Sequence, residues 1–126
     1  MSNPIEAIEG VVEEGRGIGR TMGFPTLNFP YAGSNEGIFV GEVVINGRNF
    51  RAAVHIGARP TFFDEDMVCE SFLLDFDEEV LPGTKVVVKI YKRIRGVMKF
   101  ENLEFLKKQI SKDVEFVENW YNSREK

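Results

Sequence analysis

The sequence of 126 residues contains one cysteine, one histidine and no long apolar run. Because Cys69 stands alone, an intramolecular disulfide and a four-cysteine zinc site are excluded, and a reducing compartment is favoured. No stretch approaches the ~18 consecutive apolar residues of a membrane-spanning helix. The first ten residues lack the basic and apolar regions of a secretory signal. We therefore expect a cytoplasmic protein that does not associate with a membrane.

The composition is that of a globular domain, with 43% hydrophobic and 29% charged residues. The length fits a single domain over residues 1–126, and no repeat or linker divides it. A net charge of −4 argues against a nucleic-acid binder. Six basic residues and no acidic one lie between residues 83 and 100. This stretch could attract a small polyanion, or it could be a solvated strand face.

Glycine and proline separate short runs of β-branched and aromatic residues, which predicts a mainly β protein. The strands are expected at residues 5–13, 38–45, 48–56, 68–76 and 84–93. Asn46-Gly47 between the second and third of these runs predicts a two-residue hairpin, because both residues tolerate the positive φ that such a turn requires. An acidic turn ending in Pro82-Gly83 joins the last two strands.

The C-terminal segment changes to a helical period. Apolar residues recur every three or four positions and share one helical face: Leu103, Leu106, Ile110, Val114, Val117 and Tyr121. Asn102 can cap the start, and Glu104 lies in the first turn, where a carboxylate suits the helix dipole. Five or six short strands followed by one helix predict a small antiparallel barrel with the helix packed outside.

A glycine-rich segment follows the first predicted strand. Its glycines and arginines are Gly15, Arg16, Gly17, Gly19, Arg20 and Gly23. Backbone N–H groups of such a loop can approach phosphate oxygens, and arginine adds charged donors. The segment has neither a Walker ending nor a dinucleotide-binding fingerprint. By spacing alone, a phosphate-binding loop and a mobile surface loop are equally good interpretations.

Thr26 and Asn28 alternate with Leu27 directly after Pro25. On an extended backbone both polar side chains then point the same way. A hydroxyl and an amide oxygen are ligands that Mg²⁺ accepts beside substrate phosphates. A hydrogen-bonded pair at a strand edge is the alternative interpretation.

Glu70 interrupts an otherwise apolar strand face that includes Val68, Phe72 and Leu74. An ionised carboxylate is costly to bury without a partner, and desolvation would raise its pKa toward that of a general base. A β-bulge or a buried salt bridge would instead give Glu70 a structural role. His55 is expected to be partly exposed, and Cys69, opposite the apolar face, is not expected to be a nucleophile.

The order of these motifs resembles the riboflavin kinase family. The matching segments are GRGIGRTMGFPTLN at 15–28, GIF at 37–39, HIGARPTF at 55–62, CESFLLDF at 69–76 and KRIRGVMKF at 92–100. The resemblance covers residues 9–118, and the run into GFPTLN is its most specific part. In bacteria this domain usually forms the C-terminal half of a bifunctional FAD synthetase, so the chain resembles a stand-alone kinase or one such module.

The resemblance implies a six-stranded Greek-key barrel that transfers the γ-phosphoryl group of ATP to the ribityl 5′-hydroxyl of riboflavin, giving FMN and ADP. It implies that residues 15–23 cover the nucleotide phosphates and that Thr26 and Asn28 hold Mg²⁺ and phosphate. Glu70 would be the general base, and Arg95 and Phe100 would lie near the flavin. A monomer with no nucleic-acid partner is expected.

The chain departs from the family pattern on the flavin side. Phe72 stands where members often have histidine, Val97 where an acidic residue is common, and His55 where a smaller polar residue is frequent. These departures keep open the alternative of a flavin-binding module without turnover. A second alternative is a small barrel that binds protein or oligonucleotide, against which the acidic net charge and Glu70 argue.

Overall fold

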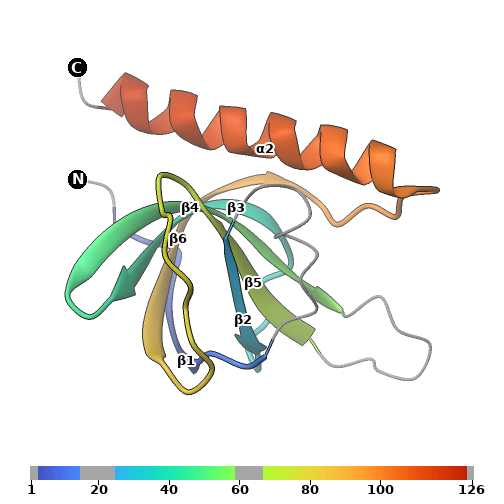
Figure 1. The fold of residues 1–126 in the computed structure, drawn as a ribbon. Helices are drawn as coiled ribbons and strands as arrows, with labels where there is room; N and C mark the ends of the chain where they lie inside the picture. The colour runs from blue at the N-terminus through green and yellow to red at the C-terminus, as the bar shows by residue number, and fades with distance from the viewer. Residues whose placement is uncertain (1–2, 15–24, 59–66, 125–126) are drawn as a thin grey trace.

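The computed structural model describes residues 3–14, 25–58 and 67–124. It contains six strands and one long helix: β1 (Glu6–Val11), β2 (Thr26–Pro30), β3 (Gly37–Ile45), β4 (Arg48–Ala58), β5 (Met67–Leu73), β6 (Lys85–Arg95) and α2 (Leu103–Arg124). The strands form one antiparallel sheet in the order β1-β6-β3-β4-β5-β2, which curls into a barrel, and α2 lies across its outside (Figure 1). The mainly β barrel with an external C-terminal helix is confirmed.

The two edge strands meet at one point, where the curled sheet closes. Glu13, just after β1, forms an isolated bridge with Asn28 of β2, and its N–H donates to the Asn28 carbonyl oxygen at 2.8 Å. Gly10 lies against the ring of Phe29, where an added Cβ would be 2.3 Å from the nearest ring carbon. A side chain at position 10 would therefore force β1 away from β2.

The hairpin between β3 and β4 has the predicted turn. Asn46 and Gly47 both have positive φ, 51° and 78°, and Ile45 pairs directly with Arg48. This turn sets the register of the two central strands. The predicted strand boundaries agree with the structure to within a few residues.

Two hydrophobic clusters hold the fold together. The first fills the barrel interior and includes Phe29, Phe39, Val54, Leu73 and Ile90. The second lies between the sheet and α2, and its buried members are Val40, Ala53, Phe72, Leu74, Ile110, Val114 and Val117. The helix therefore covers the outer face of the sheet around Val40, Ala53 and Phe72.

Helix α2 begins as the sequence predicts. The Phe105 N–H donates to the Asn102 side-chain oxygen at 3.0 Å, which is an N-cap hydrogen bond. Near the other end, the Tyr121 hydroxyl donates to the Gly41 carbonyl oxygen at 2.7 Å and ties the helix to β3. Leu103 differs from the expectation, because it is 48% exposed although it shares the apolar helical spacing. Nowhere in the described part of the chain does a helix combine the length and apolar character needed to cross a membrane.

Candidate active site

Glu70 lies in the middle of a row of side chains that crosses the sheet. Its direct partner on β2 is Asn28, and its direct partner on β4 is His55. The row continues through Ile38 on β3 to Arg95 on β6. Directly paired residues of antiparallel strands point to the same face. The register therefore brings three of the predicted site residues, Asn28, Glu70 and Arg95, onto one outer face of the barrel. We call the whole set across the sheet the polar row: Asn28, Glu70, His55, Ile38 and Arg95.

Along its own strand, the neighbours of Glu70 on the same face are apolar. Phe72 and Leu74, two and four residues along the same strand face, are buried in the cluster under α2. Burial raises the pKa of the Glu70 carboxyl above its usual value. Within residues 3–14, 25–58 and 67–124, no arginine, lysine or histidine forms an ion pair with it.

The two structural alternatives for Glu70 can be compared with this geometry. The pairing of β5 with β2 and with β4 is continuous through Glu70, so no β-bulge turns the carboxylate away from its face. Among the described residues, no salt bridge to Glu70 is present. The geometry is that of a partly desolvated carboxylate whose oxygen atoms are available to a ligand.

Thr26 and Asn28 extend the same face onto the edge strand β2. Thr26 pairs directly with Phe72, and Asn28 pairs with Glu70, so both polar side chains lie on the side of the sheet that carries the carboxylate. Both residues are partly buried. The backbone of Asn28 also closes the barrel through its bridge to Glu13. The position of Asn28 is thus fixed from both neighbouring strands.

The donor set at this position suits a hard cation that keeps other oxygen ligands. In the described part of the chain, no three His, Cys, Asp or Glu side chains come together as a metal site. Thr26 and Asn28 instead offer one hydroxyl and one amide oxygen. Mg²⁺ commonly takes few protein ligands and fills its remaining positions with water and substrate phosphate oxygens. The residues present fit such a cation.

The sequence alone did not indicate which side chains surround His55. As predicted it is partly exposed and lies opposite the strand's interior-facing residues Ala52, Val54 and Ile56. Its neighbourhood depends on strand pairing, which puts it directly beside Glu70. Burial lowers the pKa of the imidazole, and the nearby Arg95 lowers it further, whereas Asp113 and Glu36 act in the opposite direction.

Arg95 ends β6 and points to the helix. Its guanidinium group forms two hydrogen bonds with the carboxylate of Asp113 on α2, Nε to Oδ1 at 3.1 Å and Nη2 to Oδ2 at 2.8 Å. Phe100, the other predicted flavin residue, is partly buried in the connection between β6 and α2. Val97 and Met98 in this connection are exposed, as are Leu103 and Phe105 just beyond it.

Several predicted residues lie outside the described part of the chain. These are the phosphate-loop residues Gly15, Arg16, Gly17, Gly19, Arg20 and Gly23, and residues 59–62 of the HIGARPTF motif. In the sequence, the described residues next to segment 15–24 are Glu14, which follows Glu13, and Pro25, which precedes Thr26. Glu13 and Thr26, close to these two ends, both lie at the edge of the sheet that carries Asn28.

Cys69 lies opposite the strand face that carries Phe72 and Leu74, as predicted. There it is fully buried in the barrel interior. On the outer face of β5, Glu70 is only partly buried, whereas Phe72 is buried in the cluster under α2. Burial raises the pKa of the thiol to about 12, which agrees with the expectation that it is not a nucleophile.

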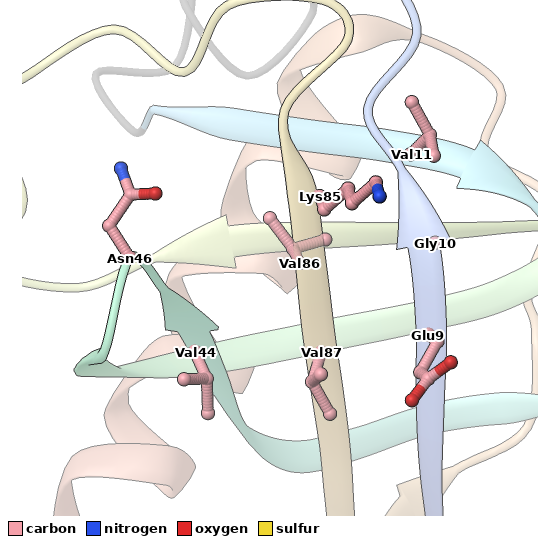
Figure 2. Close-up of a pocket in the computed structure, with 8 residues that line it drawn as sticks. All are labelled: Glu9, Gly10, Val11, Val44, Asn46, Lys85, Val86 and Val87. Atoms are coloured by element: carbon pink, nitrogen blue, oxygen red, sulfur yellow. The ribbon is translucent and has the colours of Figure 1, made fainter.

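A surface hollow lies on another part of the barrel. It is lined by residues of β1, β3 and β6 and by the hairpin turn, including Glu9, Val11, Val44, Asn46 and Val87 (Figure 2). None of the predicted site residues contributes to it. This hollow belongs to the outer face of β1, β6 and β3, apart from the polar row.

Comparisons with known proteins agree with the resemblance in the sequence. The family model described as Flavokinase, riboflavin kinase, matches residues 3–121. The bifunctional riboflavin kinase/FMN adenylyltransferase of Bacillus subtilis (strain 168) is 37% identical over 113 residues, covering 84% of this chain and 35% of that protein. The protein of the same description from Haemophilus influenzae is 34% identical, over 92% of this chain and 39% of that protein.

A solved structure shares the fold. The crystal structure of a protein described as a macrolide-efflux protein from Streptococcus pneumoniae superposes with a TM-score of 0.79 and 32% identity, covering 93% of this chain and 39% of that one. The chain thus spans somewhat more than a third of the length of these relatives. Since the family model covers nearly all of its 126 residues, the chain belongs to the riboflavin kinase family.

Proposed function

We propose that the chain catalyses the ATP-dependent phosphorylation of riboflavin at the ribityl 5′-hydroxyl, giving FMN and ADP. One observation carries the proposal beyond family membership. Glu70 is a partly buried carboxylate without an ion pair in the described part of the chain, and it lies directly opposite Asn28. A carboxylate that can accept a hydroxyl proton, next to neutral oxygen ligands for a metal ion, suits phosphoryl transfer to a hydroxyl group.

Glu70 acts as the general base in this proposal. It accepts the proton of the 5′-hydroxyl as that oxygen attacks the γ-phosphorus of ATP. An efficient general base has a pKa near the working pH, and burial moves the pKa of Glu70 in that direction. No ion pair with a described residue offsets the effect of burial on this carboxyl group.

Thr26 and Asn28 hold the phosphate end of the nucleotide together with Mg²⁺. When bound, Mg²⁺ would neutralise the charge of the phosphate oxygens. The protein's own contribution is orientation: the hydroxyl and the amide lie on one face of β2, two residues apart and level with Glu70 and Phe72. The nucleotide is expected to approach from the glycine-rich segment 15–23.

The flavin is expected at the other end of the polar row, near Arg95 and Phe100. The exposed apolar side chains of Val97, Met98, Leu103 and Phe105 lie in and beside the connection that carries Phe100. Apolar surface next to a guanidinium group suits a flat ring with carbonyl oxygens on its edge. A single domain over residues 1–126 acting as a cytoplasmic monomer, or as a module of a bifunctional FAD synthetase, remains a prediction.

The proposal is tested by incubating the purified chain with riboflavin, ATP and Mg²⁺ and separating the flavins by chromatography. We expect FMN and ADP in equal amounts, and we expect excess chelator to stop the reaction. Thr26→Ala should lower turnover by about 10²-fold, since interactions with transferring phosphates contribute several kcal/mol. The matched control is Thr84→Ala. It removes a hydroxyl that donates a hydrogen bond to the Leu81 carbonyl oxygen in a turn.

Two results would favour the alternatives. Tight riboflavin binding without FMN formation would identify a non-catalytic flavin-binding module. Failure to bind either flavin or nucleotide would favour a barrel that binds protein or oligonucleotide. Full turnover in excess chelator would remove the metal from the proposal while leaving the kinase reaction in place.

A further inference from the structure

Asp113 is a buried charged residue on α2, only 4% exposed. It lies beside Ile110, Val114 and Val117, which pack against the sheet. A carboxylate in such a position is unfavourable unless it is paired and hydrogen-bonded. Asp113 has both kinds of partner: the Arg95 guanidinium at 2.8 and 3.1 Å, and the Gln109 amide, whose Nε2 donates to Oδ1 at 3.1 Å.

The local course of β6 aims Arg95 at this carboxylate. The pairing of β6 with β3 shifts register twice near its end, once between Ile38 and Phe39 and once between Val40 and Gly41. Such irregularities rotate the following side chains relative to a regular strand. Ile94 consequently packs on the cluster under α2, and Arg95 reaches the helix.

Arg95 also fixes the backbone that leads away from β6. Its Nη1 donates to the carbonyl oxygen of Gly96 at 3.0 Å, at the first residue of the connection to α2. Asp113 therefore acts on residues 96–102 through one rigid, planar group. The guanidinium has five N–H donors, and three hydrogen bonds to Asp113 and Gly96 leave two of them for a ligand.

We propose that Asp113 is a positioning residue for flavin binding. It orients Arg95 so that the two remaining donors serve an uncharged acceptor such as a ring carbonyl oxygen, and it holds the connection 96–102 in the conformation that carries Phe100. The charge of Arg95 is balanced by Asp113, so the pair suits an uncharged ring rather than a phosphate group. This inference rests on the proposed function, because it assumes that riboflavin is the ligand.

The first test compares riboflavin affinity, measured by quenching of flavin fluorescence without ATP, between the wild type and Asp113→Asn. We expect the dissociation constant and KM for riboflavin to rise by about tenfold to a hundredfold, because the hydrogen bonds that orient Arg95 involve charged groups. The KM for ATP and the kcat at saturating flavin should change by less than about threefold. Asp113→Glu should restore part of the affinity, since it keeps the charge.

Glu104→Gln is the control, because Glu104 forms an exposed pair with Lys107 on the same helix at 3.9 Å. It should leave riboflavin affinity unchanged. A folded Asp113→Asn protein that binds riboflavin within twofold of wild type, or that loses kcat at unchanged affinity, overturns the proposal. If Asp113→Asn does not fold, Arg95→Lys decides instead: it keeps the charge beside Asp113 but lacks the planar fork, so unchanged affinity overturns the proposal.

Failure of the inference is distinguishable from failure of the proposed function. A wild-type chain that binds riboflavin but makes no FMN contradicts the kinase proposal, while the affinity comparison between variants still tests Asp113. A wild-type chain that binds no riboflavin contradicts both.

Discussion

The two faces of strand β5 differ in burial and in chemistry. The inner face contributes Cys69, Ser71 and Leu73 to the barrel interior, where each is at most 1% exposed. The outer face contributes Glu70 and Phe72, with Glu70 level with polar residues of the neighbouring strands. Along this strand, residues that fill the barrel interior therefore alternate with residues on the face that carries Glu70. Substitutions at adjacent positions should have separable effects.

The largest expected effect is on the outer face. Glu70→Gln keeps the shape of the side chain and removes its proton-accepting charge, so turnover should fall by about 10²–10⁴-fold. Riboflavin and ATP should still bind, and the melting temperature should hold or rise slightly, because a desolvated charge is removed. Turnover, flavin affinity and melting temperature are measured on one preparation.

Glu9→Gln on the exposed outer face of β1 is the matched control, and it should be neutral in all three measurements. Near-wild-type turnover of Glu70→Gln would exclude Glu70 as the base. Loss of folding would instead indicate a structural role for this carboxylate.

Substitutions on the inner face of the same strand should lower the free energy of unfolding. Leu73→Ala removes a side chain that is 1% exposed and should lower the free energy of unfolding by about 2–5 kcal/mol. The kcat of the molecules that remain folded should be close to wild type, since Leu73 points away from the polar row. Denaturant unfolding and turnover below the melting temperature check both statements.

Leu81→Ala provides the comparison for a leucine that is 63% exposed, and its stability should change by less than about 0.5 kcal/mol. If Leu73→Ala lowered kcat as strongly as Glu70→Gln, the separation of the two faces would be wrong.

The pH dependence of turnover should be set by Glu70 on the outer face. The usual carboxyl pKa is 4.5, and burial raises that of Glu70. Because the base must be deprotonated, kcat/KM should fall about tenfold per pH unit below the raised pKa, with its midpoint above 4.5. A midpoint at or below 4.5 in a pH–rate profile would contradict this assignment.

The same shift has a consequence for stability with a definite sign. The folded state holds the Glu70 proton more tightly than the unfolded state, so the stabilising contribution is present below the unfolded pKa and is lost as the pH rises through the folded pKa. The melting temperature of Glu70→Gln relative to wild type should therefore increase as the pH rises. A difference that is constant with pH would show that Glu70 has no raised pKa.

The smallest expected effect concerns the helix that covers the outer face. Asn102→Ala removes the side-chain oxygen that accepts from the Phe105 N–H and should cost about 0.5–2 kcal/mol. Asn102→Gly should cost less, because glycine is tolerated at this position. Thermal melts of the two variants check the order, and equal losses would show that the side-chain hydrogen bond contributes little.

Local signals predicted the parts of the fold that depend on neighbouring residues. Asn46-Gly47 marked the hairpin turn and Asn102 the helix start, because each acts within a few residues. The short strand β2 was expected only as an extended segment over residues 25–28, since Pro25 and the glycine-rich run interrupt the pattern. Leu103 fits the helical spacing but lies in the first turn, where it is half exposed.

The candidate site depended on information that local patterns do not contain. The apolar neighbours of Glu70 made it conspicuous in the sequence, but its position beside His55 follows from the register of β4 and β5. The alternation placed Cys69 opposite Phe72 correctly, but its full burial depends on the closure of the barrel around the inner face of β5. Asp113 is an ordinary helical aspartate in the sequence, and only the register shifts of β6 bring Arg95 to it.

The order of the strands has a consequence for how the chain folds during synthesis. Glu6 of β1 pairs with Ile90 of β6, whereas β3 and β4 are joined by a two-residue turn. The hairpin can therefore form early, while β1 must wait until almost the whole barrel has left the ribosome, since long loops have to close before such distant contacts form. We expect the contact between β1 and β6 to form late in folding and to limit its rate.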